Sequence, residues 1–96
     1  NMDFVVSVER LPSPGETVLG TQFRMIPGGK GANQACAAGK LGAPRVTTAM
    51  AGRVGYDVFA DHLKASLSAA GVEVASVHAT RSEPTGVALI SVDRGA

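Results

Sequence analysis

The chain has 96 residues, enough for one small domain or for part of a larger one, and its single cysteine cannot form a disulfide within the chain. The formal net charge of +1, with 4% aromatic residues and no basic stripe, argues against a nucleic-acid-binding surface. The apolar runs are too short to cross a membrane, so we expect no membrane partner. Because scarce cysteine is typical of a reducing compartment, we expect a cytoplasmic protein.

The first predicted elements are two strands joined by a turn. Apolar residues recur at every second position over about 4–10, which is the period of a strand. Residues 11–15 hold two prolines and a glycine and predict a turn. Residues 17–26 predict a second strand, with apolar residues on one face and polar residues on the other. This pattern favours an antiparallel pair with one solvated face.

The rest of the chain alternates between predicted helices and strands. The elements follow in order: a helix over 31–41, a buried parallel strand over 46–51, a turn over 52–55, a helix over 57–70, and strands over 72–79 and 85–92. Helices alternating with strands indicate an α/β class, and we expect the first two strands and the last one to form an antiparallel appendage. A sheet of so few strands is a poor domain by itself, so we expect the N-terminal portion of a larger α/β protein.

Residues 28–33, Gly-Gly-Lys-Gly-Ala-Asn, lie at the start of the first predicted helix. Glycines let a ligand approach the backbone closely, and the first N–H groups of a helix have no partner within the helix. Lys30 adds a cation, and Asn33 adds both a donor and an acceptor. The spacing matches neither a phosphate-binding P-loop nor a dinucleotide fingerprint. The stretch therefore favours a polyhydroxylated or anionic small molecule, although a plain strand-to-helix turn explains it equally well.

Asn1 and Asp3 form a second candidate pair. Residues two apart on a strand face the same side, and both residue types are disfavoured inside strands. A carboxylate beside an amide suits the hydroxyl groups of a sugar. The alternative is a turn in which Asp3 bonds the local backbone.

The other polar residues give weaker signals. We expect His62 and His78 to lie on the surface, Cys36 to act as a small buried apolar residue, and Arg53 and Asp57 to be solvated or paired with each other. No group of His, Cys, Asp and Glu has the spacing of metal ligands, so we assign no metal-binding residue to the chain.

Taken together, these stretches resemble the ribokinase/minor-phosphofructokinase family of sugar kinases over essentially the whole chain. Three groups of residues carry the resemblance: residues 28–35 with Gly42 and Gly52, then Asn1 and Asp3 with residues 12–17, and finally residues 85–90. The first group is similar to the family's first signature, the second to the segment before it, and the third to a later lid strand.

The resemblance implies a three-layer α/β/α fold with an antiparallel β lid. Residues 1–96 would be the N-terminal fragment of one such domain, with lid strands at about 4–10, 17–26 and 85–93 and an α/β core at about 29–79. In the family the lid strands also form a dimer contact, so we expect a homodimer through the lid. Six residues would supply an apolar lid face: Phe4, Val6, Val8, Leu19, Phe23 and Met25.

The implied activity is phosphoryl transfer from ATP to a sugar hydroxyl. Lys30 and residues 34–35, Gln-Ala, are similar to family members that convert D-ribose to ribose 5-phosphate. By position, Asn1 and Asp3 would bind sugar hydroxyls. The same sugar would be lined on its other side by Gly29, Lys30 and Asn33, with Gly28 shaping the loop.

The resemblance places the rest of the machinery outside these residues. The chain contains no Gly-Ala-Gly-Asp run, the family's second signature, which supplies the catalytic base and an anion hole. ATP with Mg²⁺ and a monovalent cation such as K⁺ would bind mainly to downstream residues. We therefore assign no catalytic residue to this chain and expect it to be inactive alone. Because it opens on Asn1 rather than Met, we also expect an upstream segment.

Two alternatives remain open. Lys30 would also suit a phosphorylated sugar, as in the phosphofructokinase branch of the family. The chain would otherwise be a non-catalytic sugar-binding or dimerisation module that keeps only the acceptor loop and the lid.

Overall fold

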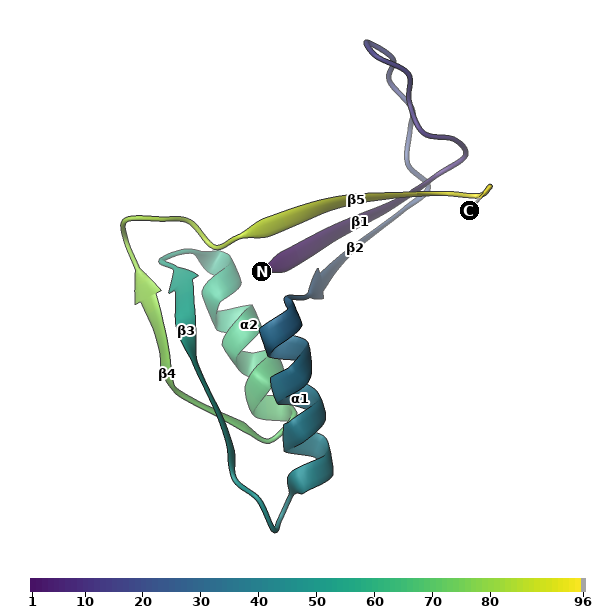
Figure 1. Cartoon of the computed structure of the whole chain (residues 1–96). Helices are drawn as coiled ribbons and strands as arrows, with labels where there is room; N and C mark the ends of the chain where they lie inside the picture. The colour runs from purple at the N-terminus through teal and green to yellow at the C-terminus, as the bar shows by residue number, and fades with distance from the viewer. Residues whose placement is uncertain (96) are drawn as a thin grey trace.

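The computed structural model describes residues 1–95, and Ala96, the last residue of the predicted fragment, lies outside the described residues. The elements in chain order are β1 (Met2–Val8), β2 (Gln22–Pro27), α1 (Lys30–Gly42), β3 (Thr48–Gly55), α2 (Val58–Ala69), β4 (Val72–Thr80) and β5 (Val87–Asp93). Figure 1 shows two parts: β1, β2 and β5 form an elongated sheet, and the other four elements form a body at one end of it. The predicted α/β class is confirmed.

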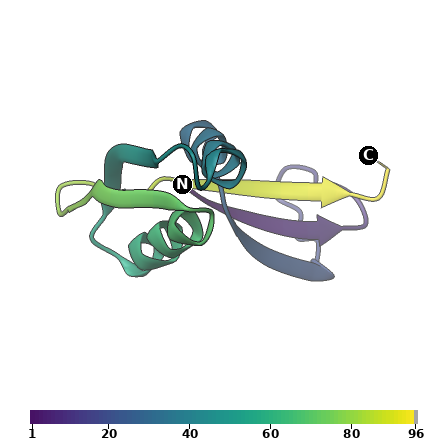
Figure 2. The same ribbon diagram turned by 90° about the horizontal axis from the view of Figure 1, so that it is seen from below.

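The elongated sheet has β1 in its centre, in the order β2-β1-β5 (Figure 2). β1 and β2 are antiparallel, as predicted, with Phe4 opposite Met25 and Val6 opposite Phe23. β5 runs parallel to β1, with Phe4 opposite Leu89, so the prediction of three antiparallel strands is wrong. The chain returns to the sheet through α1, β3, α2 and β4, and a crossover of that length lets β5 enter in the same direction as β1.

The loop between β1 and β2 is longer than predicted. β2 begins at Gln22, so residues 17–21 are not a strand, and residues 9–21 project beyond the sheet in Figure 1. Glu16 organises this loop, because its carboxylate accepts from the Arg10 guanidinium at 2.8 Å and from the Ser13 backbone N–H at 3.0 Å. The Arg10 guanidinium also holds the pKa of Glu16 below its usual value. These local bonds give the segment a turn of its own, so strand pairing starts only after it.

The predicted turn over 52–55 is also wrong. β3 continues to Gly55, because its parallel pairing with β4 resumes after an irregularity between Ala49 and Ala51 and extends to the pair of Gly55 and Thr80. The strand predicted over 46–51 is parallel, as expected, but it is not buried, because Val46, Ala49 and Ala51 are exposed and Met50 is half-buried. The glycines in residues 52–55 indicated a turn locally, whereas the backbone pairing depends on a strand much later in the chain.

The two predicted helices are confirmed as α1 and α2. Their small and apolar residues build the core of the body with β3 and β4. Four buried residues form its centre: Leu67, Ala70, Val72 and Val77. Ala32, Ala35 and Cys36 of α1 pack against this centre, and Cys36 is half-buried rather than buried as predicted.

Aromatic rings join the sheet to the body. The Phe4 ring of β1 stacks on Phe23 of β2, with ring centroids 6.0 Å apart. The edge of the Phe59 ring, at the start of α2, meets the Phe4 ring at 5.5 Å. Such pairs contribute about 0.5–1.5 kcal/mol beyond the burial of apolar area. Phe4 therefore fixes the sheet against the first turn of α2.

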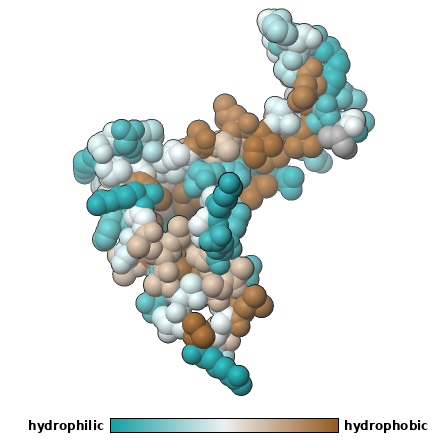
Figure 3. Space-filling view, viewed as in Figure 1, coloured by the Kyte–Doolittle hydropathy of each residue, from teal (hydrophilic) through white to brown (hydrophobic). Residues whose placement is uncertain are grey.

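Large apolar side chains remain exposed along the sheet, where Figure 3 shows brown surface over its strands. Leu89 is 84% exposed and Phe23 is 61% exposed, and Leu19 in the projecting loop is 84% exposed. Within residues 1–95, no helix has the length and apolar character needed to cross a membrane.

Candidate functional site

The start of β1 and the two segments that connect the sheet to the body meet at one point. The backbone N–H of Gly28 donates to the Asn1 carbonyl at 2.8 Å, and the Asn1 amino group donates to the Gly28 carbonyl at 3.3 Å. The Met2 N–H donates to the Gly86 carbonyl at 2.9 Å. The start of β1 is thus held between the end of β2 and the segment that leads into β5.

Asn1 and Asp3 contact each other at this junction. The Asn1 side-chain amide donates to Oδ1 of Asp3 at 2.5 Å, which confirms that the two residues share one side of the strand. Among residues 1–95, Oδ2 of Asp3 makes no hydrogen bond to the protein. One acceptor oxygen of the carboxylate is therefore unused among the described residues, and the alternative of an Asp3 side chain bonded to local backbone is wrong.

Gly28 lies directly against the Asp3 carboxylate. A Cβ added at Gly28 would come within 2.4 Å of Asp3 Oδ2 and 2.6 Å of Oδ1. Real Cβ contacts are not this short, so any other residue would displace the carboxylate. Gly28 is also buried, which leaves no open side for a larger group. The prediction that Gly28 shapes the loop now has a steric reason, which is the space that Asp3 occupies.

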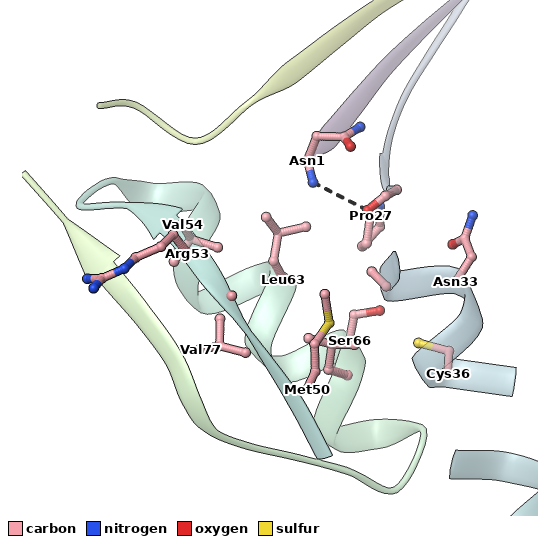
Figure 4. Close-up of a pocket in the computed structure, with 14 residues that line it drawn as sticks. Asn1, Pro27, Asn33, Cys36, Met50, Arg53, Val54, Leu63, Ser66 and Val77 are labelled. Carbon is pink, nitrogen blue, oxygen red and sulfur yellow. Dashed lines mark hydrogen bonds between the residues drawn. The ribbon is translucent and has the colours of Figure 1, made fainter. Parts of the chain in front are cut away.

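The N-terminus of α1 follows immediately. Gly29 precedes the helix with φ of 105°, a conformation that other residues rarely adopt, and no side chain within residues 1–95 caps the helix. The first N–H groups of α1 are therefore available to a ligand, and they carry the positive end of the helix dipole. Lys30 and Asn33 both lie exposed on the first turn. Figure 4 shows the Asn33 side chain directed toward the end of the helix that faces Asn1.

The six predicted site residues are brought together in part. Asn1, Asp3, Gly28 and Gly29 are in direct contact or adjacent in the chain. Lys30 and Asn33 lie at the same junction, but within the described residues no side-chain hydrogen bond or ion pair joins either of them to Asn1 or Asp3.

A pocket of about 110 Å³ opens between this junction and the body (Figure 4). Three of the predicted residues contribute to its wall, namely Asn1, Gly28 and Asn33. The deeper wall is apolar, and Figure 4 shows Met50 and Leu63 directed into it. The pocket thus combines polar residues of the junction with mostly apolar residues of the body.

A buried hydrogen-bond network next to the junction was not predicted. The backbone N–H of Thr85 donates to Asp57 Oδ2 at 2.8 Å, and the Thr85 hydroxyl donates to Oδ1 at 2.8 Å. The same hydroxyl accepts from the Gly55 N–H at 2.8 Å. Asp57 Oδ1 also caps α2 by accepting from the Phe59 N–H at 3.2 Å. These donors, Thr85 first, hold the pKa of Asp57 below its usual value.

Of the two alternatives expected for Arg53 and Asp57, pairing with each other is therefore wrong, and solvation holds for Arg53 but not for the hydrogen-bonded Asp57. Arg53 is exposed, and no ion pair joins the two side chains in the part of the chain that the structure describes. The position of Asp57 directly before an apolar helix indicates a helix cap. Nothing in the nearby sequence indicates that its other partner is Thr85, which lies 28 residues later. His62 and His78 are exposed, as expected. In residues 1–95, no three His, Cys, Asp or Glu side chains gather as a metal site would require.

The sequence and the fold identify the class of protein. The pfkB family of carbohydrate kinases matches residues 1–96, and the chain belongs to this family. It is 42% identical to the ribokinase of Bacillus subtilis over 95 residues and 36% identical to the deoxyribokinase of Salmonella typhi over 92 residues. Among solved structures, it resembles Arabidopsis thaliana ribokinase complexed with ribose and ATP, with a TM-score of 0.83, 37% identity and 97% of this chain covered.

The chain spans about a third of the length of these relatives. The alignments cover 99% of this chain and 31% of the Bacillus subtilis protein, 96% of this chain and 29% of the Salmonella typhi protein, and 30% of the Arabidopsis chain.

Proposed function

We propose that the complete protein transfers a phosphoryl group from ATP to a sugar hydroxyl, with D-ribose as acceptor and ribose 5-phosphate as product. Membership of the pfkB family supports the reaction class. The ribokinase relative with 42% identity, and the solved relative whose ligands are ribose and ATP, support the acceptor. The scarcity of cysteine supports a cytoplasmic location.

The acceptor sugar binds, in this proposal, between the start of β1 and the N-terminus of α1. The observation that carries this assignment is the free Oδ2 oxygen of Asp3, held beside Gly28 at the end of the strand. A carboxylate oxygen accepts from sugar hydroxyls, and the Asn1 amide both donates and accepts. On the opposite side, Gly29 exposes the helical N–H groups, and Lys30 and Asn33 add polar contacts.

The remaining parts of the reaction belong to residues outside this chain. Phosphoryl transfer depends on positioning the reactants and stabilising the charge of the transferred group. ATP with Mg²⁺ and a monovalent cation such as K⁺ bind mainly to those other residues. The catalytic base is also one of them. The chain of 96 residues holds the acceptor side only, so it has no kinase activity by itself.

The three-stranded sheet acts as a lid over the sugar, with residues 29–79 as the α/β core. Its central strand carries Asp3, and its apolar side chains remain exposed, including Phe23 and Leu89. Exposed apolar surface of this kind favours association, which supports a homodimer formed through the lid. The projecting Leu19 belongs to a loop rather than to the strand face predicted for it.

A phosphorylated sugar is the second candidate acceptor, and Lys30 favours it. The Lys30 side chain is exposed at the helix N-terminus, and within residues 1–95 it forms no ion pair. A free ammonium group beside helical N–H groups is suited to a phosphate.

ADP release by the full-length protein tests the function. The assay contains ATP, Mg²⁺ and K⁺ with ribose, 2-deoxyribose, fructose, fructose 6-phosphate or adenosine, and the 96-residue chain serves as a parallel sample. We expect ribose to give the highest kcat/KM and the short chain to give no turnover. Turnover with fructose 6-phosphate in preference to ribose would establish the second candidate. No turnover with any acceptor would favour a non-catalytic sugar-binding module.

A further inference from the structure

Thr85 is a buried polar residue that is not among the residues proposed to contact the sugar. Its side chain is 5% exposed, and it follows the loop that leads from β4 to β5. Its hydroxyl donates its one hydrogen to Asp57 Oδ1, and one of the oxygen's two lone pairs accepts from the Gly55 N–H. A buried hydroxyl with both capacities used is held in one orientation.

Helix capping alone does not account for this network. The cap of α2 needs one oxygen, and Asp57 Oδ1 supplies it to the Phe59 N–H. Oδ2 accepts from the Thr85 N–H, and Oδ1 accepts from the Thr85 hydroxyl as well. The carboxylate therefore fixes both the backbone and the side chain of Thr85 to the turn between β3 and α2.

The residue after Thr85 holds the start of β1. The Gly86 carbonyl accepts from the Met2 N–H at 2.9 Å. A Cβ added at Gly86 would lie 3.6 Å from the Cβ of Asn1, in van der Waals contact. A continuous path thus runs from Asp57 through Thr85 and Gly86 to Met2, the residue that follows Asn1.

We infer that Asp57 and Thr85 are positioning residues for the acceptor sugar, which they do not touch. They hold Gly86 against the body and thereby set where Asn1 and Asp3 present their polar atoms relative to Gly28 and Gly29. This inference rests on the proposed function, because it assigns the pair to the same sugar site. Sugar affinity, rather than the chemical step, is what the pair would control.

Two isosteric substitutions in the full-length protein test the inference. Asp57→Asn retains an oxygen that can cap α2 but turns an NH₂ group toward one of the Thr85 donors. Thr85→Val removes the hydroxyl at nearly constant shape, and Thr85→Ser restores it. Asp61→Asn is the matched control, since Asp61 is an exposed carboxylate in the first turn of the same helix.

We expect the KM for ribose to rise about tenfold in Asp57→Asn and in Thr85→Val, as the loss of one hydrogen bond to a charged group would give. The kcat and the KM for ATP should remain close to wild type, and Thr85→Ser and Asp61→Asn should behave like wild type. A merely structural role would instead lower the active fraction and the apparent kcat at unchanged KM. An unchanged KM for ribose in both isosteric variants would overturn the inference.

Hydrogen exchange separates this inference from the proposed function. If the wild-type protein phosphorylates no sugar, the proposed function fails, whereas exchange still reports on the positioning contact. We expect the peptide that contains Met2 to exchange faster in Thr85→Val than in wild type, because its N–H bonds to Gly86. Equal exchange rates in the two proteins would overturn the positioning role whatever the activity.

Discussion

The carboxylate of Asp3 occupies the space that a side chain at Gly28 would need. The distance from Asp3 Oδ2 to a Cβ built on Gly28 would be 2.4 Å. The two residues come from different segments of the chain and meet because the end of β2 pairs with the start of β1. The geometry of the candidate sugar site therefore depends on a glycine that need not touch the sugar.

Gly28→Ala should weaken sugar binding more than it weakens the fold. The methyl group would collide with the end of the Asp3 side chain, which can rotate away, so the carboxylate moves rather than the backbone. We expect the KM for ribose in the full-length protein to rise at least tenfold, with a small change in the melting temperature. Gly95→Ala is the control and should match wild type, because an added Cβ in this turn would lie 3.8 Å from Asp93 Oδ1, an ordinary van der Waals distance. A normal KM in Gly28→Ala would contradict the assigned position of Asp3.

Asp3→Ala tests the proposed acceptor directly. The substitution would leave sugar hydroxyls without their carboxylate partner, at a cost of about 1–3 kcal/mol for each lost bond. The measurement is the KM for ribose in the full-length protein, together with the KM for ATP, which should not change. An unaltered KM for ribose would remove Asp3 from the site.

Lys30→Ala distinguishes the two acceptor classes. In a ribose site, a hydroxyl contact to Lys30 is one of several contacts. The binding of a phosphorylated sugar would instead depend on the positive charge of Lys30. We expect similar, moderate losses in kcat/KM for ribose and for fructose 6-phosphate, with ribose still preferred. A much larger loss for fructose 6-phosphate, combined with wild-type preference for that sugar, would move the protein to the phosphofructokinase branch.

The Asp57 network predicts how stability depends on pH. Hydrogen bonds from Thr85 lower the pKa of Asp57 in the folded protein below that of the unfolded chain. The network therefore stabilises the fold at pH values above the unfolded carboxyl pKa of about 3.9 and loses this contribution as the pH falls through the lower folded value. Thermal melting between pH 7 and pH 3 should show a shallower decline in Asp57→Asn than in wild type. Identical slopes would mean that Asp57 makes no pH-dependent contribution.

Local patterns predicted the helices and the side chains that share one face of a strand. Asn1 and Asp3 are close together because alternation along β1 is a property of the strand itself. Strand partners were less predictable. Nothing in residues 87–93 specifies whether they pair parallel or antiparallel with β1, since direction depends on the crossover between them.

The candidate site likewise has a part that the sequence predicts and a part that it does not. The glycine-rich start of α1 could be read from residue types, because Gly29 lies at positive φ and Gly28 permits a close approach. The link between Asp57 and Thr85 could not, because its partners are 28 residues apart and each has an ordinary local explanation. Folding alone brings these side chains together.

In the proposed function, the start of β1 and the N-terminus of α1 form the acceptor site of a sugar kinase. A crystal structure of the full-length protein with bound ribose would decide whether they do. We expect ribose hydroxyls within hydrogen-bonding distance of the Asp3 carboxylate and of the first turn of α1. Ribose bound elsewhere, with Asp3 and Gly29 making no contact to it, would contradict the claim.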